Sequence, residues 1–278
     1  MSYVHTISSA NLSFSDLQNV LSENARLGLS EESIGKISRC REYLDKKIAS
    51  SSEPVYGINT GFGSLYNKNI PKDQLEKLQE NLVMSHACGM GAEVPHEIVK
   101  LILFLKIQSL AYGHSGVQVA TVQRLVDLFN SHMLPTIYEM GSLGASGDLA
   151  PLAHLSLPLI GLGEVYFENR KYSGGELLKL AGWEKLHLKS KEGLALLNGT
   201  QFMSAYGVWC LINAQRILQL ANLIGALSLD AFDGRLDPFD RDVHRVRAHE
   251  GQSTTAAEIG LHLLPISYIA HVARHAHR

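Results

Sequence analysis

The sequence has few of the features that mark disulfide-bonded, nucleic-acid-binding or secreted proteins. Its 278 residues include only 3 cysteines, Cys40, Cys88 and Cys210, with no CxxC pair, which argues against a disulfide framework or a zinc knuckle. The 25 Lys and Arg nearly balance the 27 Asp and Glu, and no long run of like charge offers a surface for nucleic acid or a membrane. The N-terminus lacks a basic segment followed by an apolar run, so no secretory signal is expected. We therefore expect a cytoplasmic protein.

Charge is also missing from one long internal segment, residues 193–215. By length alone this segment could cross a lipid bilayer. Its polar residues, among them Asn198, Thr200 and Gln201, would be costly in hydrocarbon unless paired. We interpret the segment, together with residues 217–229, as helix buried on all sides within protein. Such helices predict a central bundle completed by other subunits.

Helical periodicity dominates the remainder of the chain. Apolar residues recur at helical spacing in residues 31–48, 72–86, 94–113 and 119–129. Strand-like alternation is limited to short stretches such as residues 164–167 and 170–172, two arms of a hairpin that turns at Glu168-Asn169. The predicted fold is mainly α, with a few short strands in the N-terminal part and the start of a long-helix bundle.

Two domains are expected from this pattern. Residues 1–192 would form an N-terminal domain and residues 193–278 the start of the central bundle, with an atypical tail from about residue 259. The tail contains the histidines His262, His271, His275 and His277. Their irregular spacing, with no carboxylate among the last three, does not match a metal site, and none is predicted.

Three glycine-rich segments interrupt the helices, at residues 56–63, 86–91 and 141–148. Loops on a rigid scaffold are common positions for functional groups. The first segment lacks the third glycine of a dinucleotide fingerprint, and no P-loop sequence is present. The third differs from the elbow of serine hydrolases because Asp148 stands in place of its last glycine. None of these stock motifs is therefore predicted.

The third segment contains a tripeptide that can build an electrophile from its own backbone. In a sharply bent loop, the amide nitrogen of Gly147 can attack the carbonyl carbon of Ala145 and close a five-membered ring. Loss of water from the ring, and of the Ser146 hydroxyl as a second water, leaves an exocyclic methylene conjugated to a carbonyl. Asp148 would then begin a helix whose amides can hold developing negative charge. A flexible turn capped by an aspartate explains the same residues, and both interpretations stay open here.

Four segments in a fixed order resemble the histidine ammonia-lyase branch of the aromatic amino acid lyase family. They are YGINTGFGSL, NLVMSHACGMG, GSLGASGDLAPLAHLSLPLIGLGEV and KEGLALLNGTQ, within a resemblance that runs from about residue 4 to about residue 258. The resemblance implies a mainly α fold and a homotetramer that shares its active sites among subunits. It also implies that Ala145-Ser146-Gly147 cyclise into 4-methylidene-imidazol-5-one with no added cofactor.

The same resemblance implies roles for individual residues. Tyr56 matches the acid/base tyrosine at the β-carbon of the substrate, and His86 matches the position that faces the substrate's ring. Asn198 matches the amide that contacts the electrophile and the substrate. Gly144 and Asp148 are expected to help form and hold the electrophile. An imidazole at residue 86 can share a hydrogen bond with a histidine substrate, since each ring offers one donor and one acceptor.

The implied reaction is that of a carbon-nitrogen lyase, the elimination of ammonia from L-histidine to give urocanate. A tyrosine- or phenylalanine-type lyase or aminomutase stays open as an alternative, because tyrosine-selective lyases also have a histidine near this position. Family members are about twice as long, and their later motif of the form YSLRCxPQ, with a tyrosine and an arginine for the substrate carboxylate, is absent. The chain is thus expected to match the N-terminal half of the family, and an inactive fragment is the second alternative.

Overall fold

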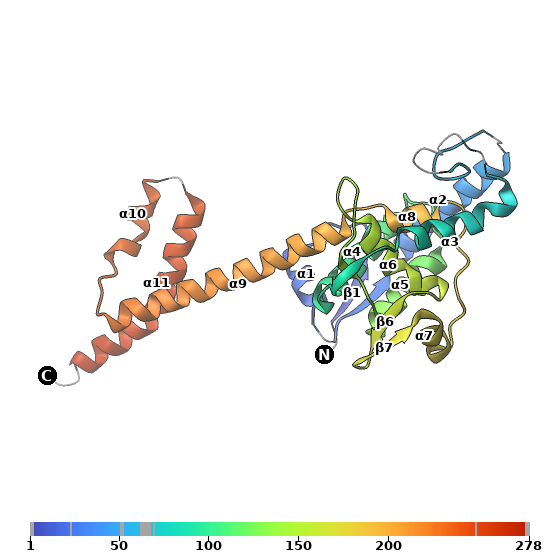
Figure 1. The fold of residues 1–278 in the computed structure, drawn as a ribbon. Coiled ribbons are helices and arrows are strands. Elements are labelled where there is room, and N and C mark those ends of the chain that lie inside the picture. Colours follow the sequence, from blue (N-terminus) through green and yellow to red (C-terminus); the bar gives the residue numbers. More distant parts are fainter. Residues whose placement is uncertain are drawn as a thin grey trace. The chain divides into compact units, whose positions relative to one another are not determined.

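The computed structural model describes residues 3–22, 24–50, 53–61, 68, 70–247 and 249–275 (Figure 1). The side chains of Lys72 and of residues 264–275 lie outside that description, as does the whole of His277. Helices make up 59% of the chain and strands 10%, which confirms the mainly α fold. The chain divides into two compact units, Met1–Trp209 and Cys210–Arg278, whereas the sequence suggested a division after residue 192. Each unit is described by itself.

The helices of the first unit follow the periodicity of the sequence. They are α1 (Phe14–Val20), α2 (Glu31–Ser50), α3 (Leu75–His86), α4 (His96–Ala111), α5 (Val119–Asn130), α6 (Leu149–Ser156), α7 (Gly174–Ala181) and α8 (Glu192–Leu197). A short 3-10 turn, η2 (Lys72–Gln74), leads into α3, and a second one, η3 (Leu157–Ile160), follows α6. The four helices predicted from apolar spacing are confirmed as α2, α3, α4 and α5, because each stripe packs against the core.

Local capping signals explain where two of these helices begin. The side chain of Ser13 accepts a hydrogen bond from the Asp16 amide at the start of α1, while Asp16 accepts one from the Ser13 amide. Ser173 and Glu176 form the same reciprocal pair at the start of α7. Such a capping box satisfies amide groups that the first turn of a helix leaves without partners.

The strands are short and form three small sheets. β1 (Val4–Ile7) pairs in parallel with β2 (Arg26–Leu29), and β3 (Met90–Glu93) pairs antiparallel with β5 (Tyr138–Met140). The third sheet has the order β4 (Leu134–Pro135), β6 (Glu164–Phe167) and β7 (Arg170–Ser173). The predicted hairpin is confirmed as β6 and β7. Its two turn residues, Glu168 and Asn169, have positive φ angles of 47° and 61°, which suit the twist of a tight hairpin.

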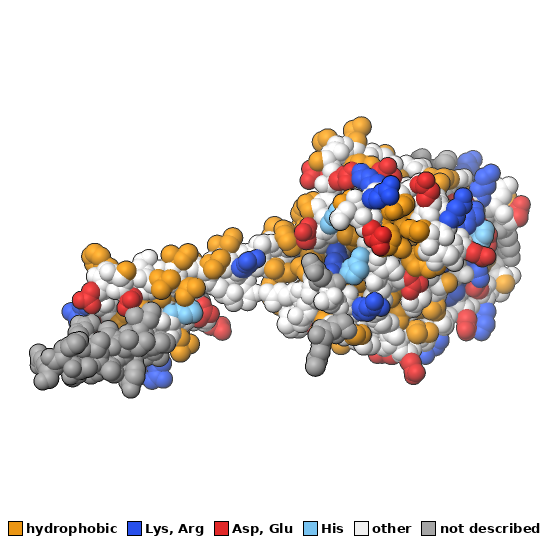
Figure 2. All heavy atoms as spheres, turned by 90° about the horizontal axis from the view of Figure 1, so that it is seen from below, with side chains coloured by type: hydrophobic (Ala, Val, Ile, Leu, Met, Phe, Trp, Pro, Cys, Tyr) orange, Lys and Arg blue, Asp and Glu red, His pale blue; other side chains and the backbone are white. Residues whose placement is uncertain are grey.

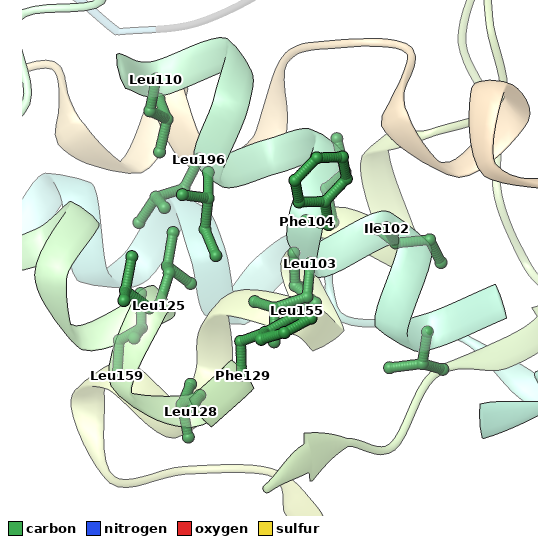
Figure 3. Close-up of a cluster of buried hydrophobic side chains, with 14 of the residues drawn as sticks. Ile102, Leu103, Phe104, Leu110, Leu125, Leu128, Phe129, Leu155, Leu159 and Leu196 are labelled. Atoms are coloured by element: carbon green, nitrogen blue, oxygen red, sulfur yellow. The ribbon is translucent and has the colours of Figure 1, made fainter. Parts of the chain in front are cut away.

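Helix α4 forms the centre of the first unit. It is apolar nearly all round, as expected of a helix enclosed by protein on all sides. α5 packs against it, and side chains from α4, α5, α6, η3 and α8 meet in one buried cluster (Figure 3). That cluster includes Leu103, Phe104, Phe129, Leu155, Leu159 and Leu196. Lys106 and Gln108 are the polar residues buried on the same helix.

The uncharged segment is two helices, so the prediction of one continuous helix is wrong. α8 ends at Leu197, residues 198–200 form a break, and α9 runs over Gln201–Ala231. The break includes Gly199, whose φ of 149° is incompatible with continuing a helix. Within the second unit, apolar residues of α9 such as Leu211 and Ile217 are 62% and 65% exposed in this single chain, and Figure 2 shows apolar side chains along that helix.

The rest of the second unit consists of η4 (Asp237–Phe239), α10 (Arg241–Arg245) and α11 (Glu250–His275). α11 lies beside α9, where the side chain of Asn222 donates a 2.6 Å hydrogen bond to Glu258. His262 belongs to α11, but the side chains of His271 and His275 lie outside the described residues. Among the residues that the structure describes, no helix is long and apolar enough to span a membrane, and no cluster of three His, Cys, Asp or Glu side chains could hold a metal ion.

Candidate active site

Three helices that pack against one another flank most of the predicted site residues. α3 ends at His86, α6 begins directly after the 141–148 loop, and α8 ends just before Asn198. Each of these helices packs against the other two. The fold therefore brings segments that are far apart in the sequence to one place in the first unit.

The 141–148 loop joins β5 to α6 and is sharply bent. Gly141, Gly144 and Gly147 have φ angles of 100°, 125° and 75°, a region that side chains other than that of glycine rarely adopt. The hydroxyl of Ser142 donates a short hydrogen bond to the carbonyl of Gly147 and closes the loop on itself. A Cβ atom at Gly147 would meet nothing within 4 Å, so space is open beside that residue. A bent backbone with open space at Gly147 is what the proposed ring closure needs.

The same loop is tied to the segment that follows α3. Gly141 lies so close to Cys88 that a Cβ atom at Gly141 would be 2.7 Å from the Cys88 carbonyl oxygen. The Cys88 thiol donates to the Gly141 carbonyl at 3.5 Å. The segment is held from a second side, because the Gly89 amide donates a 2.9 Å hydrogen bond to Nε2 of His154 on α6. Burial lowers the pKa of His154, which favours the unprotonated Nε2 that can accept this bond.

Gly141→Ala is expected to lower the free energy of unfolding by about 2 kcal/mol or more, because alanine would combine an unfavourable backbone conformation with a collision against Cys88. Gly182→Ala is the matched control. Gly182 ends α7 with a φ of 67°, but a Cβ atom there meets nothing within 4 Å. Urea unfolding followed by circular dichroism should show the larger loss for Gly141→Ala. Equal losses would mean that the contact with Cys88 does not constrain the loop.

His86 lines a cavity together with this loop. The cavity has a volume of about 280 Å³ and is lined by Ser85, His86, Cys88, Gly141, Leu143, Gly144, Leu149 and Ala150. Nδ1 of His86 lies 2.9 Å from the Leu82 carbonyl oxygen, which can only accept, so Nδ1 carries a proton. In a neutral ring Nε2 is then an acceptor. His86 and Gly144 thus line the same cavity.

Tyr56 lies in the turn at residues 56–59 and is 57% exposed. It lines neither the cavity beside Gly144 nor a second one of about 330 Å³ on the far side of His86, which is lined by Gly61, Lys68, Ile70 and residues of α3. Residues 62–67 of the same glycine-rich segment lie outside the described residues.

Asn198 and its neighbours lie directly beside the 141–148 loop. The Ser146 hydroxyl donates a 3.2 Å hydrogen bond to the Gly199 carbonyl, within the break between α8 and α9. Asn198 ends α8, with its amide 3.0 Å from the Leu194 carbonyl and its side chain exposed. The Ser146 hydroxyl therefore contacts the residue that directly follows Asn198.

Asp148 precedes α6 as predicted, but its side chain caps a different helix. The carboxylate is 1% exposed, and Oδ2 accepts hydrogen bonds from the amides of Phe202 at 2.6 Å and Met203 at 3.4 Å, in the first turn of α9. No side-chain cap of α6 is formed. Burial raises the pKa of Asp148, while the two amides, a hydrogen bond from the Ser146 side chain and the charge of Lys106 act in the opposite direction. Asp148 thus links the 141–148 loop to the start of α9.

Lys106 is a residue of this region that the sequence prediction missed. It projects from the apolar helix α4, is 1% exposed, and its Nζ donates to the carbonyls of Ala195 and Asn198, both at 2.8 Å. Burial lowers its pKa to about 7, and the charge of Asp148 partly opposes that shift. A lysine within a long apolar run was the signal that could have indicated it.

Comparisons with known proteins agree with the fold. A family model described as aromatic amino acid lyase matches residues 12–278, which includes the tail that the motifs had left outside the resemblance. A histidine ammonia-lyase of Legionella pneumophila is 44% identical over 278 residues, covering 100% of this chain and 54% of that relative. The chain spans about half the length of the curated relatives it matches.

Solved structures of the same kind superpose closely on this chain. The crystal structure of histidine ammonia-lyase from Trypanosoma cruzi has a TM-score of 0.84 at 36% identity, covering 92% of this chain and 50% of that one. The tyrosine aminomutase of Streptomyces globisporus has a TM-score of 0.86 at 35% identity, covering 93% of this chain and 48% of that one. With the family match over nearly its whole length, this chain belongs to the aromatic amino acid lyase family.

Proposed function

We propose that the chain carries the electrophile-forming part of a carbon-nitrogen lyase that eliminates ammonia from L-histidine and yields urocanate. The observation that carries this proposal is the bent loop at Ala145-Ser146-Gly147, with its serine against the Gly199 carbonyl and His86 on the wall of the adjoining cavity. The similarity to proteins named histidine ammonia-lyase supports the choice of amino acid.

The prosthetic group in this proposal is 4-methylidene-imidazol-5-one, formed from Ala145, Ser146 and Gly147 without an added cofactor. The residues fit it, because the loop is bent at Gly144 and Gly147 and space is open beside Gly147. Once formed, the group supplies an electrophile that makes the substrate's amino group a better leaving group. Ser142 holds the loop closed through the Gly147 carbonyl, and Asp148 holds the end of the loop against α9.

Three side chains are proposed to act on the substrate itself. Nε2 of His86 accepts a hydrogen bond from an N–H of the substrate's imidazole, since Nδ1 of His86 is committed to Leu82. Tyr56 takes the proton from the β-carbon while the amino group leaves the α-carbon and a double bond forms between the two. A phenol of pKa near 10 acts as a base at neutral pH only where its surroundings stabilise the phenolate. Asn198 is proposed to orient the substrate beside the electrophile.

We further propose that the active protein is a homotetramer in the cytoplasm. The exposed apolar residues of α9, such as Leu211 and Ile217, support the tetramer, because contiguous apolar surface of this kind is commonly covered by another chain. The free thiols of Cys40, Cys88 and Cys210 suit a reducing compartment.

A tyrosine-directed lyase or aminomutase is the second candidate. The structural similarity to tyrosine aminomutase is as close as that to histidine ammonia-lyase, with TM-scores of 0.86 and 0.84. His86 suits a phenol nearly as well as an imidazole, because Nε2 can accept a hydrogen bond from the hydroxyl of tyrosine.

The proposal is tested by intact mass spectrometry with peptide mapping of the purified full chain, followed by product assays. We expect the peptide that contains Ala145-Ser146-Gly147 to lack two molecules of water relative to its sequence. L-histidine should then give urocanate, measured by its absorbance, with L-tyrosine and L-phenylalanine tested in parallel. An unmodified peptide would overturn the electrophile, a tyrosine product would favour the second candidate, and a modified chain without turnover would show that this chain alone is inactive.

A further inference from the structure

The ammonium group of Lys106 is buried at the end of α8. Its two hydrogen bonds go to the carbonyls of Ala195 and Asn198, each at 2.8 Å. The last four carbonyls of a helix have no partner within the helix, and buried carbonyls need a donor from elsewhere. Lys106 therefore completes the hydrogen bonding of α8 at the residue where the chain turns away toward Gly199.

The other side of the same break is held by Asp148. Its carboxylate accepts from the Phe202 and Met203 amides, which are among the groups that α9 leaves without a helical partner at its start. Residues 198–200 are thus fixed between a buried cation at the end of α8 and a buried anion at the start of α9. The Ser146 hydroxyl contacts the middle of this short segment, at the Gly199 carbonyl.

We propose that Lys106 is a positioning residue for the electrophile, because it fixes the Asn198 carbonyl and thereby the Asn198 side chain and the Gly199 carbonyl against Ser146. The inference rests on the proposed function and extends it to a residue that touches neither the tripeptide nor a substrate. Lys106 acts through residues 198–200 and has no contact of its own with Ser146 among the described hydrogen bonds.

The charge state of Lys106 gives this role a pH dependence. An ammonium has three N–H donors and carries a full positive charge toward the two carbonyls, whereas the neutral amine binds them more weakly. The pKa of about 7 reflects burial, and Asp148 is the charged group that acts on Lys106. The hold on residues 198–200 is therefore expected to weaken as the pH rises through about 7.

The test compares Lys106→Met with Lys100→Met in the full chain. Lys100 lies on the same helix and its Nζ also donates to a backbone carbonyl, that of Ser22 at 2.7 Å, so the control removes the same kind of bond at a place remote from the loop. The readout is the rate at which newly folded chain loses two waters from the Ala145-Ser146-Gly147 peptide, followed by mass spectrometry. We expect Lys106→Met to lose water at least about tenfold more slowly than the wild type, with Lys100→Met unchanged.

A pH profile separates positioning from a merely structural role. The ratio of the wild-type rate to the Lys106→Met rate should fall as the pH rises through about 7, because the wild type loses its ammonium there. Lys106→Arg, which keeps the charge, should restore part of the rate and show no such fall. If Lys106→Met matches the wild type at every pH, the positioning role is wrong, and a ratio that stays constant with pH would overturn the pH dependence.

Amide hydrogen exchange distinguishes a failure of this inference from a failure of the proposed function. If no chain loses water, the proposed function fails, and Lys106→Met should still exchange faster than Lys100→Met in the peptide that spans residues 194–203. Equal exchange there would overturn the inference by itself. If Lys106→Met does not fold, the same exchange comparison is made between the wild type and Lys106→Arg below and above pH 7, and identical profiles would overturn the inference.

Discussion

Ser146→Ala is expected to abolish both the loss of two waters and any ammonia-lyase activity while leaving the fold intact. The hydroxyl of Ser146 is the second leaving group, so alanine cannot give the exocyclic methylene. Removal of a group that forms a covalent catalyst commonly lowers kcat by about 10³-fold or more. The hydroxyl can donate to the Gly199 carbonyl at 3.2 Å or to the Asp148 carboxylate, and losing a bond of this kind costs about 1 kcal/mol.

These two expectations separate chemistry from stability. Intact mass spectrometry and the urocanate assay report the chemistry, and thermal unfolding reports the fold. Ser156→Ala is a matched control, because that hydroxyl also donates to a backbone carbonyl, that of Leu152 at 2.7 Å, but lies at the far end of α6. A Ser146→Ala chain that retains activity would rule out the proposed electrophile.

Glu192→Gln is expected to give the largest loss of stability, about 3 kcal/mol. The carboxylate is fully buried at the start of α8 and accepts hydrogen bonds from the amide and side chain of Gln118, the hydroxyl of Thr121 and the amide of Lys189, at 2.6 to 2.9 Å. An amide at residue 192 has a donor where Oε2 now accepts, so buried donors of its partners lose their acceptor. Because α8 ends beside Asn198, this variant is also expected to loosen residues 198–200.

Urea unfolding of Glu192→Gln is best compared with that of Glu76→Gln. Glu76 lies on the exposed side of α3, so the control removes the same charge without touching a buried network, and it should change the stability little. Similar unfolding midpoints for the two variants would mean that the buried carboxylate of Glu192 contributes no more than a surface charge does.

The sequence was sufficient to predict those elements of the fold whose physical cause is local. Helices such as α4 follow from apolar spacing, and the β6–β7 hairpin follows from two short strand-like stretches around a turn at which Asn169 tolerates positive φ. The glycine-rich loops were located for the same reason, because glycine marks a backbone that departs from helix. That His86 and Gly144 line one cavity could be expected only from the resemblance, since it depends on how α3 and α6 pack.

The features that could not be predicted depend on contacts between distant segments. Asp148 precedes α6, and only the tertiary structure shows that its carboxylate caps α9. Lys106 lies 92 positions from Asn198 in the sequence, so no local pattern connects the two. The uncharged segment was taken for one buried helix because hydropathy does not report the break at Gly199 or which chain covers an apolar face.

The two hydroxyl groups that hold the bent loop differ in what ring closure does to them. The new bond would join the Ala145 carbonyl carbon to the Gly147 nitrogen, which leaves the Gly147 carbonyl outside the ring. The hydrogen bond from Ser142 to that carbonyl can therefore persist through the whole reaction. The bond from Ser146 to Gly199 cannot, since its donor departs as water. Maturation would thus release a carbonyl acceptor next to Asn198 at the moment when the methylene forms beside it.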